Sequence, residues 1–357
     1  MLVQLFWFML GIATLVVGAN LLVRGASKLA LSFGVSPLVV GLTIVAFGTS
    51  APEIAVSVGA VLDGRTDIAV GNVVGSNIFN VLFILGVSAL IAPLIVHVQL
   101  IRQEVPIMIG ASLLLLLFAL DGRVSRPEAA MLLALLLAYT VFLVVQSRRE
   151  TSAAQAEFEQ EMPAAGGWDA HWAAQVGLVL AGLGALVLGS DWLVGAAVHF
   201  AKALGVSDLV IGLTIVAAGT SMPEVATSVT AAIKGERDIA VGNVVGSSTF
   251  NILGCVGVSG LVATGGLGVA PALLNFDLWV MIAVAFACLP VFLTGREIAR
   301  WEGGVFLAYY VAYVAYLILA AQQHDALPTF SGAMLSFVLP LTVVTLAVSA
   351  MRARKPT

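Results

Sequence analysis

Charge is the first thing that this sequence lacks. Only 10% of its 357 residues are charged, whereas a soluble domain carries about 25%. Hydrophobic residues make up 60% of the chain, and its mean hydropathy is +1.07. This composition argues against a soluble protein and predicts an integral membrane protein that crosses the bilayer several times.

Cysteine, histidine and basic clusters are also scarce. Cys255 and Cys288 both lie in apolar segments, so we interpret them as small core residues rather than ligands or a disulfide. The four histidines lack metal-like spacing and are expected at the membrane interface. A net charge of -4 without a basic block argues against nucleic acid as a partner. No motif calls for a cofactor, and the partners that we expect are ions and membrane lipid.

Apolar runs of about 20 residues can cross a membrane as helices. The sequence contains eleven such runs, and no Lys or Arg precedes the first, which argues against a signal peptide. The predicted spans are 2–23, 37–62, 68–92, 104–120, 127–147, 171–195, 208–233, 239–263, 277–294, 302–321 and 328–350. We therefore expect an all-α polytopic membrane protein. It has a five-helix unit at 1–147, a cytoplasmic linker at 148–170, a second five-helix unit at 171–321 and an extra helix at 328–350.

An internal repeat is the strongest signal in the chain. The segment 41–90 aligns on 212–261 without a gap, at a constant offset of 171 (212 minus 41), and about two-thirds of the positions are identical. Five spans separate equivalent points, so the two copies must cross the membrane in opposite directions. Inverted repeats of this kind are typical of secondary transporters.

The distribution of positive charge predicts the orientation. With the N-terminus outside and eleven spans in place, 12 Lys and Arg residues fall inside and 4 fall outside. This bias agrees with the positive-inside rule. We expect a multi-pass protein of the inner or plasma membrane, with an external N-terminus and a cytoplasmic C-terminus.

Each repeat carries an acidic residue at membrane depth. The hexapeptide GTSAPE at 48–53 returns as GTSMPE at 219–224. A carboxylate at the centre of a membrane helix costs roughly 2.5–3.5 kcal/mol on insertion scales, so Glu53 and Glu224 call for a function. Pro52 and Pro223 lack an N–H and interrupt the helix, which frees backbone oxygens. Carboxylate, hydroxyl and carbonyl oxygens together are the ligands of hard cations.

A second signature follows each hexapeptide. The run GNVVGSNIFN at 71–80 returns as GNVVGSSTFN at 242–251. Its glycines, four residues apart, allow neighbouring helices to approach closely. Ser76 and Asn80 lie on one helical face, as do Ser247 and Asn251, and we expect their oxygens to face Glu53 and Glu224. Hydrogen bonding between helices is the simpler interpretation of the same residues.

These paired motifs resemble the two alpha repeats of the sodium/calcium exchanger family, within the cation/calcium exchanger superfamily. The resemblance covers the first ten spans and implies a ten-helix core of two inverted five-helix halves. It implies that ions bind between the broken second and seventh helices and the third and eighth helices. It implies that Glu53 and Glu224 are the calcium carboxylates. It assigns further oxygens to the side chains of Thr49, Ser50, Ser76, Asn80, Thr220, Ser221, Ser247 and Asn251, and to the backbone carbonyls of Ala46 and Ala217.

The resemblance implies an antiporter that exchanges Ca²⁺ for Na⁺ by alternating access, with three Na⁺ per Ca²⁺. Asn251 departs from some prokaryotic relatives, which carry Asp there. Ca²⁺/H⁺ exchange on the same scaffold is the alternative. An intramembrane aspartyl protease would need Asp in a different setting, so we do not expect an enzyme. A structural subunit would not need duplicated oxygen-rich breaks.

Overall fold

The computed structural model describes residues 2–33, 35–149, 171–204 and 217–353. Almost all of the predicted linker (148–170) and the beginnings of the seventh span (208–233) and of the second motif (212–261) lie outside these residues. Within them, ten helices are long and apolar enough to cross a membrane. This agrees with the predicted all-α polytopic fold.

The first half contains five spans, three of which include a π-helical turn (η). Their segments are α1 (Leu2–Phe33); α2 (Pro37–Val40), η1 (Gly41–Val45), α3 (Ala46–Thr49) and α4 (Ala51–Leu62); α5 (Thr66–Phe79), η2 (Asn80–Leu85) and α6 (Gly86–Ile91); η3 (Leu100–Glu104) and α7 (Val105–Ala119); and α8 (Arg126–Arg149).

The second half repeats this order and adds one more helix. Its segments are α10 (Trp172–Ala203); α12 (Ala217–Gly219) and α13 (Met222–Ile233); α14 (Arg237–Phe250), η6 (Asn251–Cys255) and α15 (Val256–Val262); η7 (Leu273–Asp277) and α16 (Leu278–Leu293); α17 (Arg300–Ala321); and α18 (Leu327–Ala333), η8 (Met334–Val338) and α19 (Leu339–Ala353).

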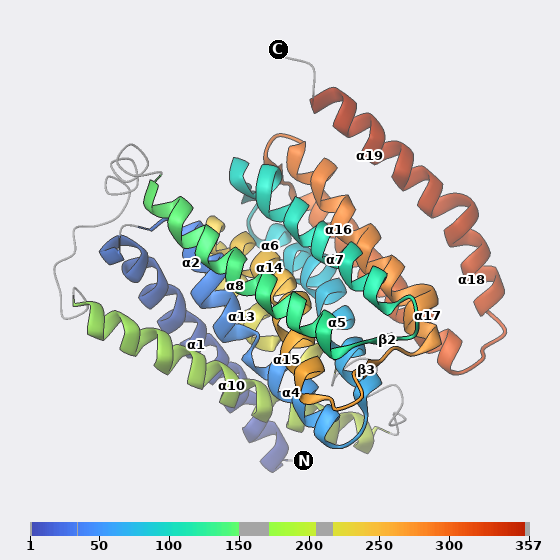
Figure 1. The fold of residues 1–357 in the computed structure, drawn as a ribbon, viewed down its shortest axis with the longest axis horizontal. Coiled ribbons are helices and arrows are strands. Elements are labelled where there is room, and N and C mark those ends of the chain that lie inside the picture. The colour runs from blue at the N-terminus through green and yellow to red at the C-terminus, as the bar shows by residue number, and fades with distance from the viewer. Residues whose placement is uncertain (1, 34, 150–170, 205–216, 354–357) are drawn as a thin grey trace.

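Helices α1 and α10 are longer than the predicted spans 2–23 and 171–195, at 32 residues each. Arg24 and Lys28 do not end α1, because long basic side chains can keep their charge at the interface while the helix continues. The two helices lie side by side along one flank of the molecule (Figure 1). Their glycines permit the contact, since a Cβ at Gly182 would lie 2.6 Å from the backbone nitrogen of Leu22.

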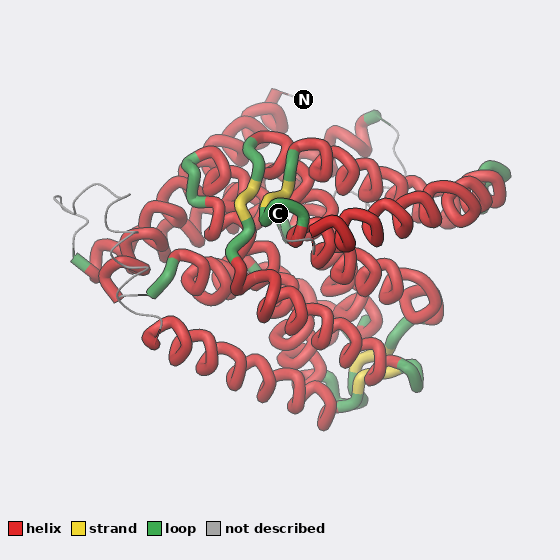
Figure 2. Tube along the Cα trace, turned by 90° about the horizontal axis from the view of Figure 1, so that it is seen from above, coloured by secondary structure: helices red, strands yellow, loops and turns green. Residues whose placement is uncertain are grey.

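Two short antiparallel sheets join the halves. Strand β1 (Leu94–Ile95) pairs with β4 (Glu297–Ile298), and β2 (Arg123–Val124) pairs with β3 (Leu267–Gly268). The sheets lie well apart in the molecule (Figure 2). Each joins two loops that the span count assigns to the same membrane side, so the pairing agrees with the predicted alternation of the spans.

Matching contacts extend the repeat beyond the sequence alignment. The hydroxyl of Tyr139 on α8 donates to Glu104 at the end of η3, and that of Tyr313 on α17 donates to Asp277 at the end of η7. The two tyrosines are 174 residues apart (313 minus 139), three more than the offset of 171 in the motifs. The two acids are 173 residues apart (277 minus 104), two more than that offset, so short insertions hide this part of the repeat from a gapless alignment.

The eleventh predicted helix corresponds to α18, η8 and α19. It packs against α16 and α17 at the edge of the molecule (Figure 1). None of the side chains described in its 20-residue apolar window is buried. As the sequence predicts, this helix lies outside the ten-helix core.

Candidate functional site

The two hexapeptides interrupt their helices at equivalent positions. In the first, α3 ends at Thr49 and α4 begins at Ala51, with Ser50 between them at φ -81° and ψ 5°. In the second, Ser221 has φ -89° and ψ 10° and precedes α13. The proline is the second residue of the new helix in both cases, where its missing N–H costs nothing. The predicted breaks are confirmed.

Each break presents a glutamate that is fully buried. Hydrogen bonds cross between the repeats, because the hydroxyl of Ser221 donates to Oε1 of Glu53 at 2.8 Å and that of Ser50 to Oε1 of Glu224 at 3.4 Å. Thr220 lies beside the Glu53 carboxylate without a hydrogen bond. Each carboxylate therefore takes its hydroxyl partner from the opposite half of the chain.

The remaining predicted side chains surround these breaks. Thr49 donates to Oδ1 of Asn243 at 3.1 Å and lies 3.4 Å from the hydroxyl of Ser247. Asn80 begins η2, which packs against α13, the helix of Glu224. Asn251 begins η6, which packs against α4, the helix of Glu53. Ser76, Ser247, Asn80 and Asn251 are all buried, as the shared helical face predicts.

The two predicted backbone ligands, Ala46 and Ala217, lie one helical turn before the breaks at Ser50 and Ser221. The carbonyl oxygen of Ala46 accepts from the backbone nitrogen of Ser50 at 3.0 Å and from the Thr49 hydroxyl at 3.4 Å. Ala217 begins α12, the short helix before the second break. The Ala46 oxygen thus lies at the break, although it has protein partners there.

Several buried polar atoms at this centre have no hydrogen-bond partner in the protein. They are Oε2 of Glu53, Oε2 of Glu224, the hydroxyl oxygens of Ser76 and Thr220, and both amide atoms of Asn80. An unsatisfied buried polar group costs about 1–3 kcal/mol, and more when it is charged. A cation site whose ligands come from the protein needs buried oxygens that no protein donor occupies, and these oxygens meet that requirement.

Sequence reasoning missed two asparagines that support the site. Asn72 donates to the Glu53 carbonyl at 3.3 Å and to Ser57 at 3.1 Å. Asn243 donates to the Glu224 carbonyl at 3.5 Å and to Ser228 at 2.9 Å. Each amide therefore holds the backbone of a buried glutamate from the neighbouring helix. Their recurrence in GNVVGS was visible, but their partners were not.

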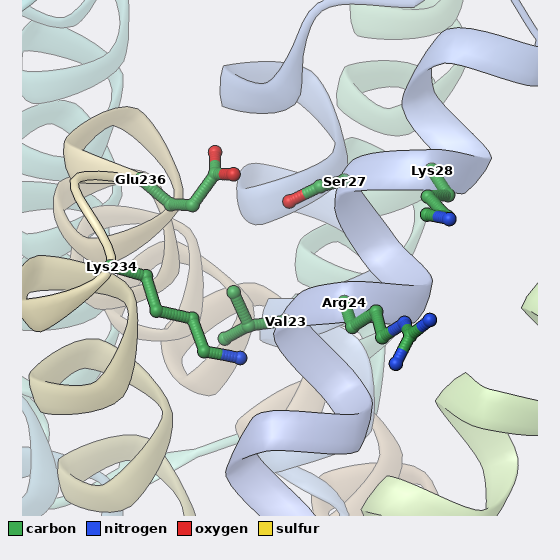
Figure 3. Close-up of a pocket in the computed structure, with 6 residues that line it drawn as sticks. All are labelled: Val23, Arg24, Ser27, Lys28, Lys234 and Glu236. Carbon is green, nitrogen blue, oxygen red and sulfur yellow. The ribbon is translucent and has the colours of Figure 1, made fainter. Parts of the chain in front are cut away.

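A separate cavity of about 180 Å³ lies between α1 and the turn that joins α13 to α14 (Figure 3). Lys234 in this turn donates to the backbone oxygen of Asn20 on α1 at 3.4 Å. Burial lowers the pKa of Lys234 and raises the pKa of Glu236. None of the predicted ligands lines this cavity. The hydrogen bond of Lys234 connects α1 to the end of the second broken helix.

Two broken helices that bury carboxylates, hydroxyls and amides within a helical membrane bundle define a secondary ion transporter. The family model "Sodium/calcium exchanger protein" matches residues 3–145 and 174–319. The chain belongs to the sodium/calcium exchanger family.

Individual relatives agree with this assignment. The chain is 40% identical to "Putative antiporter CaxA" of Alkalimonas amylolytica, over 90% of this chain and all of that protein. It is 35% identical to "Sodium/calcium exchanger MaX1" of Methanosarcina acetivorans, over 70% and 79% of the two chains. Its fold resembles the solved sodium-calcium exchanger NCX_Mj with a TM-score of 0.74 and 30% identity, over 88% of this chain and 98% of the other. The chain is thus a cation/Ca²⁺ antiporter.

Proposed function

We propose that the chain exchanges Ca²⁺ for Na⁺ across the membrane, with ions bound between the two helix breaks. The observation that carries the proposal is the group of unpartnered oxygens there, on Glu53, Glu224, Ser76, Asn80 and Thr220. A Ca²⁺ ion takes about 6–8 oxygen ligands. Two carboxylates plus neighbouring hydroxyl and amide oxygens match that number and that chemistry.

The charge of the site favours calcium as one substrate. Glu53 and Glu224, when ionised, give a charge of about -2, which one Ca²⁺ neutralises. Two protons would also neutralise it, but they would need no ligand other than the carboxylates. The eight hydroxyl and amide side chains predicted from the resemblance therefore favour Na⁺, whose several ions can occupy adjacent groups of oxygens. Ca²⁺/H⁺ exchange remains the competing mechanism for the experiment below.

Alternating access would come, by resemblance to the family, from α1 and α10 moving against the other helices. Their direct backbone contact at Gly11, Gly18, Gly182 and Gly189 supports movement as a pair. In the membrane, we propose that the N-terminus is outside and that the turn at Lys234 is cytoplasmic, because this orientation satisfies the positive-inside rule.

Three Na⁺ per Ca²⁺ moves one net positive charge in the direction of Na⁺. We therefore expect an inside-positive potential to accelerate Ca²⁺ uptake by Na⁺-loaded proteoliposomes, since about 2.3 kcal/mol acts on each charge per 100 mV. The measurement is radioactive Ca²⁺ uptake with the potential set by K⁺ and valinomycin, and vesicles with equal Na⁺ on both sides are the control. A rate of Ca²⁺ uptake that does not depend on the membrane potential would exclude an exchange of three Na⁺ for one Ca²⁺. Ca²⁺ uptake driven by a pH gradient without Na⁺ would establish proton exchange.

A further inference from the structure

The two signatures at 71–80 and 242–251 differ at two adjacent positions, of which one pairs Ile78 with Thr249. Asn77 in the first corresponds to Ser248 in the second, at the offset of 171. The amide nitrogen of Asn77 donates to the backbone oxygen of Ser248 at 3.0 Å. A bond between equivalent positions places both residues where the two repeats meet. Asn77 is buried there, with only 3% of its surface exposed.

The hydrogen bonds of Asn77 determine how its amide is turned. The Ser248 backbone oxygen can only accept, so the NH₂ group of Asn77 must point to it. Oδ1 of Asn77 then faces Asn251, whose Nδ2 donates to it at 3.2 Å. Because Oδ1 can only accept, the orientation of the Asn251 amide is determined too, without any ambiguity between oxygen and nitrogen.

This relay makes the two halves of the site unequal. The Nδ2 group of Asn251 is directed to Asn77, so Oδ1, the amide atom that can bind a cation, points away from Asn77. The Cys255 thiol lies 3.5 Å from this Oδ1 atom. The equivalent Asn80 has no protein partner for either amide atom. Asn251 is therefore oriented before an ion arrives, whereas Asn80 must orient on binding, and preorganised ligands lose less entropy when they bind.

We propose that Asn77 is a positioning residue that orients the Asn251 oxygen toward the transported ions. The inference rests on the proposed function. It also gives a physical reason for Asn at 251 in this chain: a carboxylate there would place an acceptor against Oδ1 of Asn77. Asn77 thereby favours a site with two carboxylates over one with three.

Asn77→Ser tests the proposal, because it places the residue of the second repeat in the first. We expect the KM for Ca²⁺ to rise about 10- to 100-fold, the usual effect of removing a group that orients a metal ligand, with little change in maximal rate. Asn251→Ala should raise KM as well. The double variant should match Asn251→Ala alone, because Asn77 acts through Asn251. Ser112→Ala on α7, buried and bonded only within its own helix, is the control and should keep the wild-type KM.

Three results would overturn the proposal: an unchanged KM in Asn77→Ser, a loss of maximal rate at constant KM, or additive effects in the double variant. If Asn77→Ser does not yield enough protein for transport, Asn251→Asp is compared in the Asn77 and Asn77→Thr backgrounds by the thermal shift that Ca²⁺ induces in purified protein. The proposal requires a larger loss of that shift when Asn77 is present, and an equal loss contradicts it. A wild-type chain that transports no Ca²⁺ would instead refute the proposed function.

Discussion

At the residue scale, the buried carboxylates are the feature that the fold is least able to tolerate without an ion. Glu53 and Glu224 are fully buried, and each has one oxygen without a protein partner. Glu104 is equally buried, but Gln99, Gln103 and Tyr139 donate to it. The chain thus contains buried glutamates of the same type in two settings, one completed by protein donors and one left incomplete.

The first residue-scale prediction compares these settings. Glu53→Gln or Glu224→Gln keeps the shape but removes one charge from a site that holds a divalent cation in low dielectric, so we expect Ca²⁺ uptake to be abolished in folded protein. Glu104→Gln is the matched control and should retain uptake, because an amide can still accept from the glutamines while the Tyr139 hydroxyl accepts from it. Proteoliposome flux and size-exclusion profiles measure both. Near-normal flux in either site variant would contradict the assignment.

At the element scale, the packing of α1 on α10 depends on missing side chains. A Cβ at Gly182 would meet the backbone of α1 at 2.6 Å from Leu22 and 2.8 Å from Gly18. A Cβ added at Gly184, two residues further along α10, would have no atom within 4 Å beyond its neighbours along the helix. Small residues in such contacts let helix backbones approach within the membrane. A larger residue should therefore disturb the helix pair at Gly182, on the face of α10 that contacts α1, but not at Gly184.

The element-scale prediction follows from this difference. Gly182→Ala should lower the thermal stability of the purified protein, by about 1–3 kcal/mol, because backbone atoms cannot move aside as a flexible side chain can. Gly184→Ala should be neutral or stabilising by up to about 1 kcal/mol, since Ala favours the helix. Thermal unfolding in detergent micelles measures both variants. Equal stability of the two would show that α1 and α10 do not pack in this way.

At the scale of the whole molecule, the contacts between loops place the loops in two groups, one for each predicted side of the membrane. Besides the two sheets, the backbone nitrogen of Gly268 donates to Thr66, and Arg300 donates to the carbonyl of Ile91. Six predicted spans, an even number, lie between the two loops of each of these hydrogen bonds, so both loops face the same side of the membrane. One span fewer would place them on opposite sides. The predicted alternation of the spans between these loops and the contacts of the loops therefore support each other.

The prediction at this scale concerns orientation. In a background of Cys255→Ala and Cys288→Ala, we expect Arg65→Cys to react with an impermeant maleimide on intact cells, because the exposed turn at 63–65 should be external. His97→Cys should react only after the membrane is opened. Gel-shift labelling reads out both, and permeabilised cells verify that each thiol is reactive. Labelling of His97→Cys on intact cells would reverse or refute the topology.

The sequence by itself determined those features that depend on neighbouring residues in the chain. Hydropathy gave the spans, since about 20 apolar residues suffice to cross a bilayer. Pro52 and Pro223 gave the helix breaks, because a residue without an N–H cannot continue the hydrogen-bond ladder. The repeat then placed all the candidate ligands in two matching sets, and the structure gathers them around the breaks.

Only the tertiary structure decided which groups are partners. Ser221 donates to Glu53 across 168 residues of chain, whereas Ser50, only three residues from Glu53, does not. Asn72 and Asn243 hold the glutamate backbones, and Asn77 holds Asn251, through contacts that no local spacing encodes. Such contacts depend on how the two repeats face each other. At their meeting point, Asn77 of one half donates to the backbone of its counterpart Ser248 in the other, a contact between repeats that are not identical there.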